Sequence, residues 1–390
     1  MNTLARVAAE YKKLYRGQPL LVRSPGRVNL IGEHTDYNEG YVLPAAIDKS
    51  MYFAIASRVD TVCRVHALDM KESHEFAVNS LTPSPRHWPN YLMGVVDQFV
   101  KRSFPIGGFE CVFGGDIPIG AGLSSSAALE AGLAFALNTL FESGIDKLSL
   151  VKLAQKAENE FVGVQCGIMD QYVNMFGEKG RVLRIDCRSL ERKTYGFDYP
   201  VAIVLFDTGV SHSLASSEYN KRRAECSEGV EVVRKKYPGV THLRDVSAAM
   251  LCEFQGSMSE TVFRRCSYVV EEISRLLEAC QALERRDLNA FGQYMYETHT
   301  GLSVKYGVSC PELDSLVELV HGRSGVYGAR MMGGGFGGCT INLITQDALE
   351  DVSASVCERY KRRFGVEPKR YITSVDSGTG IVTVHDPAQL

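Results

Sequence analysis

A dense group of polar side chains lies near the start of the chain, where residues 24–36 read SPGRVNLIGEHTD. Among the apolar residues of this block stand an arginine, an asparagine, two carboxylates and a histidine: Arg27, Asn29, Glu33, Asp36 and His34. Each alone could be an ordinary solvated loop residue, but together they exceed what a simple turn needs. Sugar hydroxyls both donate and accept hydrogen bonds, and carboxylates bind them with bonds about twice as strong as neutral ones. The block is therefore predicted to hold a sugar-like ligand.

A second group combines glycine and serine, where residues 116–130 read DIPIGAGLSSSAALE. Gly120 and Gly122 allow close backbone approach, and the serines at 124–126 offer hydroxyls and helix-capping chemistry. The Ala- and Leu-rich run that follows favours a helix, whose free N–H groups and dipole attract anions. The segment predicts a phosphate site, with a serine-capped turn as the alternative. It is not a Walker A loop, because GxxxxGK[ST] does not occur.

Two shorter segments also carry candidate chemistry. Asp170, in CGIMDQ, has apolar neighbours and no cation close in sequence, so it needs a partner or a function unless it caps a helix after Gly167. Residues 331–339, MMGGGFGGC, satisfy GxGxxG. A dinucleotide-binding loop must open a helix, but the strand-like CTINLI follows, so that interpretation is rejected in favour of a tight turn.

These segments resemble, in order, the motifs of the GHMP kinase superfamily, and GRVNLIGEHTDYN is similar to its galactokinase signature. The resemblance implies that Arg27 stabilises the transferring phosphoryl group and that Asp170 is catalytic. It also implies contacts between galactose and the side chains or backbone of Arg27, Glu33, His34, Thr35, Asp36, Gly167, Asp170 and, in SSEYNKRR, Tyr219.

The second motif of the superfamily implies the ATP and metal contacts. The loop predicted to wrap the triphosphate comprises Gly120, Ala121, Gly122, Leu123, Ser124, Ser125 and Ser126. Ser126 and Glu158 are implied to hold Mg²⁺, although Glu158 alone would be interpreted as part of a solvated helix face. Trp88, in HWPNYLMG, resembles a segment near the adenine pocket, but a single aromatic residue is more often part of the core.

The elements that position these groups follow from hydrophobic patterning. Strands are predicted at 20–23, 51–58, 108–113, 181–186, 201–206 and 339–344. Helices are predicted at 90–102, 125–142, 150–162, 218–236, 260–282 and 348–363, and residues 4–14 also follow helical spacing. Their order lacks the regular βαβ alternation of a doubly wound sheet, so an α+β fold is expected. The resemblance implies a GHMP kinase domain over 1–190, a second over 191–390 with a ferredoxin-like fold, and an active site between them.

Composition limits the partners. The 390 residues carry a formal net charge of -3, with 45% hydrophobic and 23% charged residues, which gives no electrostatic reason to bind nucleic acid or an anionic membrane. Eleven cysteines without a CxxC pair fit a reducing compartment. Neither a secretory signal nor a membrane-spanning apolar run is recognised, so a cytoplasmic monomer is expected.

The function expected from the resemblance is transfer of the γ-phosphoryl of Mg-ATP to the C1 hydroxyl of α-D-galactose. One alternative is a GHMP kinase for N-acetylgalactosamine, mevalonate or homoserine; GEHTDYN argues against the last two, and its TDYN end favours galactose. Another is a sensor that binds galactose and ATP without turnover. Such sensors lack residues just after the serine run, whereas Ser126, Ala127 and Ala128 are present here.

Overall fold

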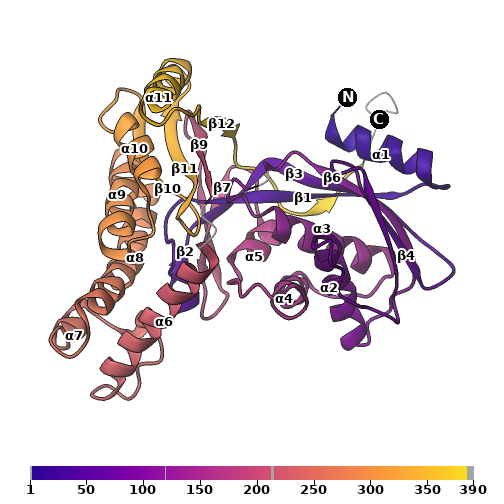
Figure 1. Ribbon diagram of the computed structural model, residues 1–390, viewed down its shortest axis with the longest axis horizontal. Coiled ribbons are helices and arrows are strands. Elements are labelled where there is room, and N and C mark those ends of the chain that lie inside the picture. The colour runs from indigo at the N-terminus through magenta and orange to yellow at the C-terminus, as the bar shows by residue number, and fades with distance from the viewer. Residues whose placement is uncertain (1, 119, 212–214, 384–390) are drawn as a thin grey trace.

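The computed structural model describes residues 2–118, 120–211 and 215–383 and shows two α+β halves side by side, as Figure 1 shows. The predicted fold class is confirmed. Among the described residues, no helix is long and apolar enough to cross a lipid bilayer.

The N-terminal half is built on a six-stranded sheet in the order β13-β1-β3-β6-β4-β5. Its strands are β1 (Leu20–Asn29), β3 (Pro44–Ser57), β4 (Val62–Ala67), β5 (Glu72–Ala77), β6 (Phe109–Gly115) and β13 (Gly380–Ile381). One face packs on α1 (Thr3–Leu14) through Val7 and Tyr11. The other face carries α2 (Trp88–Lys101), α3 (Ser125–Leu140), α4 (Lys147–Lys156) and α5 (Met169–Phe176) (Figure 1).

The C-terminal half contains an antiparallel four-stranded sheet in the order β10-β11-β9-β12. Its strands are β9 (Val201–Ser211), β10 (Val326–Met331), β11 (Gly337–Thr345) and β12 (Lys369–Thr373). Along the chain, helices separate β9 from β10 and β11 from β12, which is the ferredoxin-like topology predicted. The helices are α6 (Ala215–Arg234), α7 (Ala248–Cys252), α8 (Glu260–Glu284), α9 (Leu288–Thr300), α10 (Pro311–Val320) and α11 (Leu349–Phe364).

A small sheet and four short turns complete the described elements. The sheet comprises β2 (Tyr41–Val42), β7 (Arg181–Asp186) and β8 (Arg192–Gly196). The turns are two 3₁₀ segments, η1 (Asp36–Asn38) and η3 (Leu243–Asp245), and two π-helical segments, η2 (Ala157–Val162) and η4 (Gly301–Tyr306).

Two predicted elements differ from the structure at positions that matter for the site. The first strand was predicted at residues 20–23, but β1 continues to Asn29 through a register shift between Pro25 and Arg27. Proline is tolerated at such a bulge, where a ladder hydrogen bond is already missing. The helix predicted at 150–162 divides into α4 and the π-helical segment η2, which carries Glu158.

The segment 374–382 leaves the C-terminal sheet and crosses back to the N-terminal half. Asp376 N–H donates to the Ala46 carbonyl at 2.9 Å, and Arg23 forms an ion pair with Asp376 at 2.8 Å. β13 then pairs with β1 at the edge of the large sheet. The division of the chain at residue 190 remains a prediction. The returning segment forms a second connection between the two halves, in addition to the chain around residue 190.

Candidate active site

A partly buried ion pair joins β1 to the first turn of α5. Arg27 Nε lies 2.7 Å from Asp170 Oδ1, and Nη2 lies 2.9 Å from Oδ2, so the pair is bidentate. Burial alone would lower the pKa of Arg27, but the carboxylates of Asp170, Glu33 and Asp36 together outweigh it, and the pKa is raised. The bulge at Gly26 brings β1 against the glycine–serine loop, where Arg27 N–H donates to the Leu123 carbonyl at 3.1 Å. The two predicted catalytic residues therefore lie together beside the predicted phosphate loop.

The residues of the glycine–serine loop alternate between exposed and buried positions. Ala121 and Leu123 are buried, whereas Gly120 and Gly122 are exposed with positive φ angles of 79° and 72°. α3 begins at Ser125, so the N–H groups of its first turn lack helical partners and point to the loop. In Figure 1, α3 lies below β1, which it contacts. This geometry suits a bound phosphate.

Ser124 does not cap α3 as predicted. It occupies the N-cap position with φ 57°, makes no capping bond, and donates its hydroxyl to Asp170 Oδ2 instead. The alternative of a serine-capped turn therefore does not hold for Ser124, because a competing acceptor comes from α5, 46 residues away in sequence.

Glu33 is buried and held by the C-terminal half. Its Oε1 accepts hydrogen bonds from Arg330 Nη1 and Nη2, each at 3.2 Å, and from Gly333 N–H at 2.9 Å. Arg330 is fully buried and also donates to the Leu30 carbonyl at 2.7 Å. The polar block is thus fixed by β10 and by the glycine loop that follows it.

His34 and Asp36 reach the same space from a tight turn. His34 has a φ of 62°, and burial lowers the pKa of its imidazole to about 4. Burial, with the nearby Asp170 and Glu33 charges, raises the pKa of Asp36 to about 6. Thr35 points elsewhere: its hydroxyl lies 2.9 Å from the Gly32 carbonyl and 2.5 Å from the Tyr41 carbonyl, so its one proton is available to either carbonyl and stabilises the turn.

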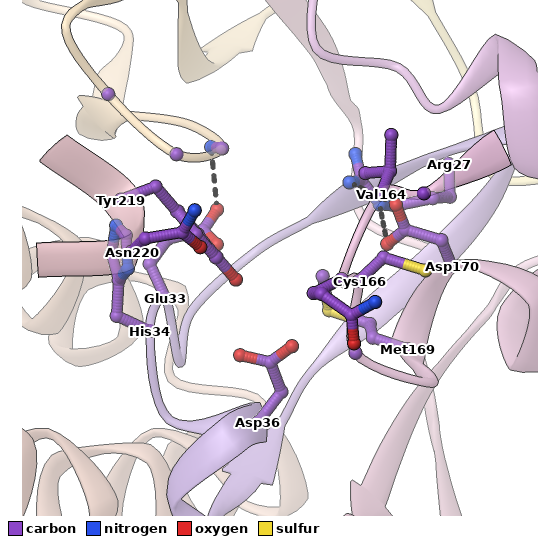
Figure 2. A pocket seen from close by; sticks show the side chains of 16 residues that line it. Arg27, Glu33, His34, Asp36, Val164, Cys166, Met169, Asp170, Tyr219 and Asn220 are labelled. Atoms are coloured by element: carbon purple, nitrogen blue, oxygen red, sulfur yellow. Dashed lines mark hydrogen bonds and ion pairs between the residues drawn. The ribbon is translucent and has the colours of Figure 1, made fainter. Parts of the chain in front are cut away.

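These residues surround a cavity of about 600 Å³ between the two halves. Figure 2 shows the Arg27–Asp170 pair facing Glu33, His34 and Tyr219 across it, with Asp36 between the two groups. The lining residues are Arg27, Glu33, His34, Asp36, Gly163, Val164, Gln165, Cys166, Gly167, Met169, Asp170, Tyr219, Asn220, Gly333, Gly334 and Gly335. Seven of the eight predicted sugar contacts are among them, and Thr35 is not.

Gly167 makes room for a neighbouring carboxylate. A Cβ atom at this position would lie 1.9 Å from Asp36 Oδ2, so a larger residue would displace the Asp36 side chain. Tyr219 lies on α6 with its ring near that of His34, at a centroid distance of 5.4 Å. The predicted sugar contacts therefore come from both halves of the chain.

One of the two predicted metal ligands, Glu158, forms a pair of buried carboxylates with Glu130. Gln171 Nε2 donates to Glu158 Oε2 at 2.8 Å and to Glu130 Oε2 at 3.4 Å. Burial raises the pKa of both carboxyls, and the Ser126 hydroxyl opposes the shift of Glu158 as a hydrogen-bond donor. Within the described ranges, Glu130 Oε1 is buried without a partner. Two buried carboxylates beside the phosphate loop fit a divalent cation.

The protein offers that cation few ligands. No group of three or more His, Cys, Asp or Glu side chains that could hold a metal occurs in the part of the chain that the structure describes. Mg²⁺ commonly uses one or two carboxylates and completes its shell with phosphate oxygens and water. Ser126 and Glu158 fit such an arrangement with a bound nucleotide.

Trp88 lies apart from the cavity. Its indole N–H donates to Glu72 at 2.9 Å, and its ring packs on Phe113 at a centroid distance of 5.7 Å. Trp88 thus belongs to the N-terminal core at the start of α2, and its predicted adenine contact stays a prediction.

Comparisons with known proteins agree with this geometry. The galactokinase galactose-binding signature matches residues 9–57, and the N- and C-terminal domains of GHMP kinases match residues 90–178 and 276–362. A galactokinase of Roseiflexus sp. (strain RS-1) is 41% identical over 93% of both chains, and one of Chloroflexus aggregans is 38% identical over 98% of both. The chain belongs to the galactokinase family.

The solved structures extend this assignment. The Lactococcus lactis galactokinase, determined in complex with galactose, has a TM-score of 0.92 and 31% identity, covering 98% of this chain and 100% of that one. A Methanococcus jannaschii mevalonate kinase, 18% identical with a TM-score of 0.62 over 92% of this chain and 99% of that one, shares the fold. As a galactokinase family member, the chain is an ATP-dependent sugar kinase.

Several residues of this galactokinase site were not found from the sequence. Arg330 stands in a strand-like run with nothing to mark it as the partner of Glu33, 297 residues away. Gln171 directly follows Asp170, so its place in CGIMDQ was the one available signal. Asn220 and the loop at 163–165 line the cavity through tertiary packing, which sequence spacing does not reveal.

Proposed function

We propose that this galactokinase transfers the γ-phosphoryl group of ATP to the C1 hydroxyl of galactose, with Asp170 and Arg27 at the reacting end of the cavity. The observation that carries the proposal is the bidentate Arg27–Asp170 pair, which borders both the cavity and the glycine–serine loop. A sugar in the cavity and a triphosphate on the loop would therefore meet at Asp170. The Lactococcus lactis relative, whose complex contains galactose, supports the choice of sugar.

In the proposed reaction, the C1 oxygen forms a bond to the γ-phosphorus, and the bond from phosphorus to the β–γ bridging oxygen breaks, releasing ADP. The C1 hydroxyl proton passes to Asp170, which acts as general base. Arg27 holds that carboxylate in place and offsets the charge that develops on the phosphoryl oxygens.

Ser126 and Glu158 are proposed to hold Mg²⁺ with the nucleotide, and Mg²⁺ would neutralise phosphate charge. The two buried carboxylates at 130 and 158, joined by Gln171, support this choice. The loop over 120–126 is proposed to hold the β- and γ-phosphates with backbone N–H groups.

Glu33, His34, Asp36 and Tyr219 are proposed to bind the sugar hydroxyls. Three carboxylates in one cavity match a ligand rich in hydroxyl donors. We also propose that the enzyme works in the cytoplasm as a monomer; its eleven cysteines, which are free and mostly buried thiols, support the reducing compartment.

Substitution of Asp170→Asn tests the reaction. We expect turnover, followed as ADP release, to fall by about 10²–10⁴-fold because the proton acceptor is lost while the shape is kept. Calorimetric galactose binding should change far less. Asp198→Asn, at an exposed position beside Arg286, is the matched control and should retain full turnover.

Near-normal turnover of Asp170→Asn would reject the proposed general base. A panel that includes N-acetylgalactosamine tests the substrate, because preferential phosphorylation of that sugar would reject galactose as the acceptor.

A further inference from the structure

Three hydrogen-bond donors of the C-terminal half surround one oxygen of the Glu33 carboxylate. Oε1 accepts from Arg330 Nη1 and Nη2 at 3.2 Å each and from Gly333 N–H at 2.9 Å, and Figure 2 marks the last bond by a dashed line. A guanidinium and a backbone N–H only donate, and a carboxylate only accepts, so the direction of each bond is fixed. We call Arg330 with Gly333 N–H the Glu33 clamp.

Arg330 is itself held firmly, because the protein uses all five of its N–H groups. Nε donates to the Leu30 carbonyl and Nη1 to the Met331 carbonyl, each at 2.7 Å, and Nη2 donates to the Asn29 carbonyl. The other two N–H groups are those that reach Glu33. Arg330 is 0% exposed, so water does not compete for these bonds. The guanidinium therefore cannot turn away from Oε1 without losing bonds to backbone carbonyls.

The second oxygen of Glu33 is the one left for a ligand. Oε2 accepts from no residue of the described ranges, and it is not among their fully buried side-chain atoms that lack a partner. Because Glu33 lines the cavity, Oε2 meets the ligand space there. At this point the cavity wall offers a pre-oriented acceptor, and the side chain carries no donor.

We propose that the Glu33 clamp makes this position of the sugar site select a hydroxyl that donates, and that Arg330 is a positioning residue for sugar specificity. This inference rests on the proposed sugar site. An amide in an ordinary site can turn to offer its oxygen to a ligand, but here an NH2 group at the Oε1 position would face three donors. In Glu33→Gln the amide oxygen therefore takes the Oε1 position and the NH2 group points into the cavity. One atom of the cavity wall changes from acceptor to donor.

Deoxyfluoro sugars test this change, because fluorine in place of a hydroxyl cannot donate a hydrogen bond. The panel is galactose and its analogues with fluorine at carbon 2, 3, 4 or 6, measured by calorimetry on the wild type and on Glu33→Gln. In the wild type, we expect the analogue fluorinated at the hydroxyl that Glu33 holds to bind about 10–100-fold more weakly than galactose. In Glu33→Gln, galactose should bind about tenfold more weakly than in the wild type, and that analogue should bind within about threefold of galactose.

The other analogues are internal controls and should keep their wild-type affinity ratios to galactose. Unchanged affinity for a non-hydrolysable ATP analogue shows that Glu33→Gln is folded. If the folded variant leaves the ratio of every fluorinated analogue unchanged, the polarity of the position has not been inverted and the proposal is overturned.

Arg330→Lys tests the clamp without altering Glu33. It keeps the positive charge but loses the planar fork that holds Oε1. We expect the affinity for galactose to fall by about five- to tenfold, with the affinity for the ATP analogue unchanged. Arg265→Lys is the matched control and should keep both affinities, because Arg265 also pairs with a carboxylate of the C-terminal half, Glu225 at 3.4 Å, and is not one of the residues that line the cavity. Full galactose affinity in Arg330→Lys, or an equal loss in both variants, would overturn the positioning role.

Failure of the proposed function gives a different result. If the wild-type protein does not bind galactose, the sugar site is rejected, and the role of the Glu33 clamp with it. If the wild type binds galactose but neither Glu33→Gln nor Arg330→Lys behaves as expected, the sugar site stands and the clamp alone is rejected.

Discussion

The three carboxylates that face the cavity are held in different ways. Asp170 is paired with Arg27, and Glu33 with the fully buried Arg330. Asp36 lies near both other carboxylates, and burial with these charges raises its pKa to about 6. Its charge is thus unfavourable in the free protein, and a ligand that donates hydrogen bonds to it would relieve that cost.

Asp36→Asn should therefore stabilise the free protein while impairing sugar binding. The pKa is raised from 3.8 to about 6, so the wild-type protein loses stability as pH rises through this interval. We expect the variant to melt at a higher temperature than the wild type at about pH 8, and the difference to disappear near pH 4. Galactose affinity should fall by about ten- to a hundredfold. Melting curves and calorimetry check both effects; a variant that is less stable at about pH 8 contradicts this account.

Gln171→Met tests whether an amide orients the proposed metal ligand. The change keeps the volume but removes the 2.8 Å bond to Glu158. We expect the affinity for a non-hydrolysable Mg-ATP analogue to fall by about five- to tenfold in calorimetry, with galactose affinity unchanged. Gln98→Met is the matched control, because Gln98 is also buried and donates to Glu160 at 2.8 Å away from the cavity. An equal loss in both variants would show general destabilisation.

Elements present the site residues through backbone geometry that glycine permits. Gly335 and Gly338, in the loop between β10 and β11 and at the start of β11, have similar φ angles of 86° and 79°. A Cβ at Gly335 would lie 2.1 Å from the Val308 carbonyl, whereas one at Gly338 meets no atom within 4 Å. The two positions separate backbone strain from crowding.

Gly338→Ala should cost about 1–2 kcal/mol of unfolding free energy from strain alone. Gly335→Ala should cost about 1–3 kcal/mol more, because the loop must also move away from Val308. That movement carries Gly333 N–H away from Glu33. The affinity for galactose should therefore fall in Gly335→Ala and be unchanged in Gly338→Ala. Denaturant unfolding and calorimetry of the two variants check this prediction. Equal losses of stability and of galactose affinity in both variants would show that crowding against Val308 is not the cause.

The extent of prediction from sequence also differs by element. Strands such as β7 and helices such as α2 and α8 follow local patterning and were located nearly correctly. By contrast, β1 continues through Pro25, and Ser124 bonds Asp170 and does not cap α3. Both features depend on partners that are distant in sequence. For the same reason Arg27 and Asp170 were identified through family resemblance, while Arg330 was missed.

At the scale of the whole molecule, the returning segment ties α5 to the large sheet. Thr379 N–H donates to the Asn174 carbonyl at 2.7 Å, and its hydroxyl lies 3.0 Å from both that carbonyl and Ser24 Oγ. Asn174 belongs to α5, the helix whose first turn carries Asp170. The returning segment thus helps to hold in place the helix that carries Asp170.

Thr379→Val should lower the free energy of unfolding by about 1–3 kcal/mol, because buried Ser24 and Asn174 lose a partner. We expect kcat to fall several-fold with little change in the KM for galactose, since Asp170 is displaced and the sugar contacts are not. Chemical denaturation and steady-state kinetics check this, with exposed Thr61→Val as the control. Unchanged stability would show that the segment is held elsewhere.

This connection has a consequence for biosynthesis. A ribosome releases the chain from the N-terminus, and the first domain of a protein generally folds while the rest is still being made. Here the edge of β1 stays open, and α5 lacks its support, until residues 374–382 have emerged. A nascent chain therefore exposes an unpaired strand edge until this segment has been made, and we expect phosphoryl transfer to begin only after the segment has emerged and docked.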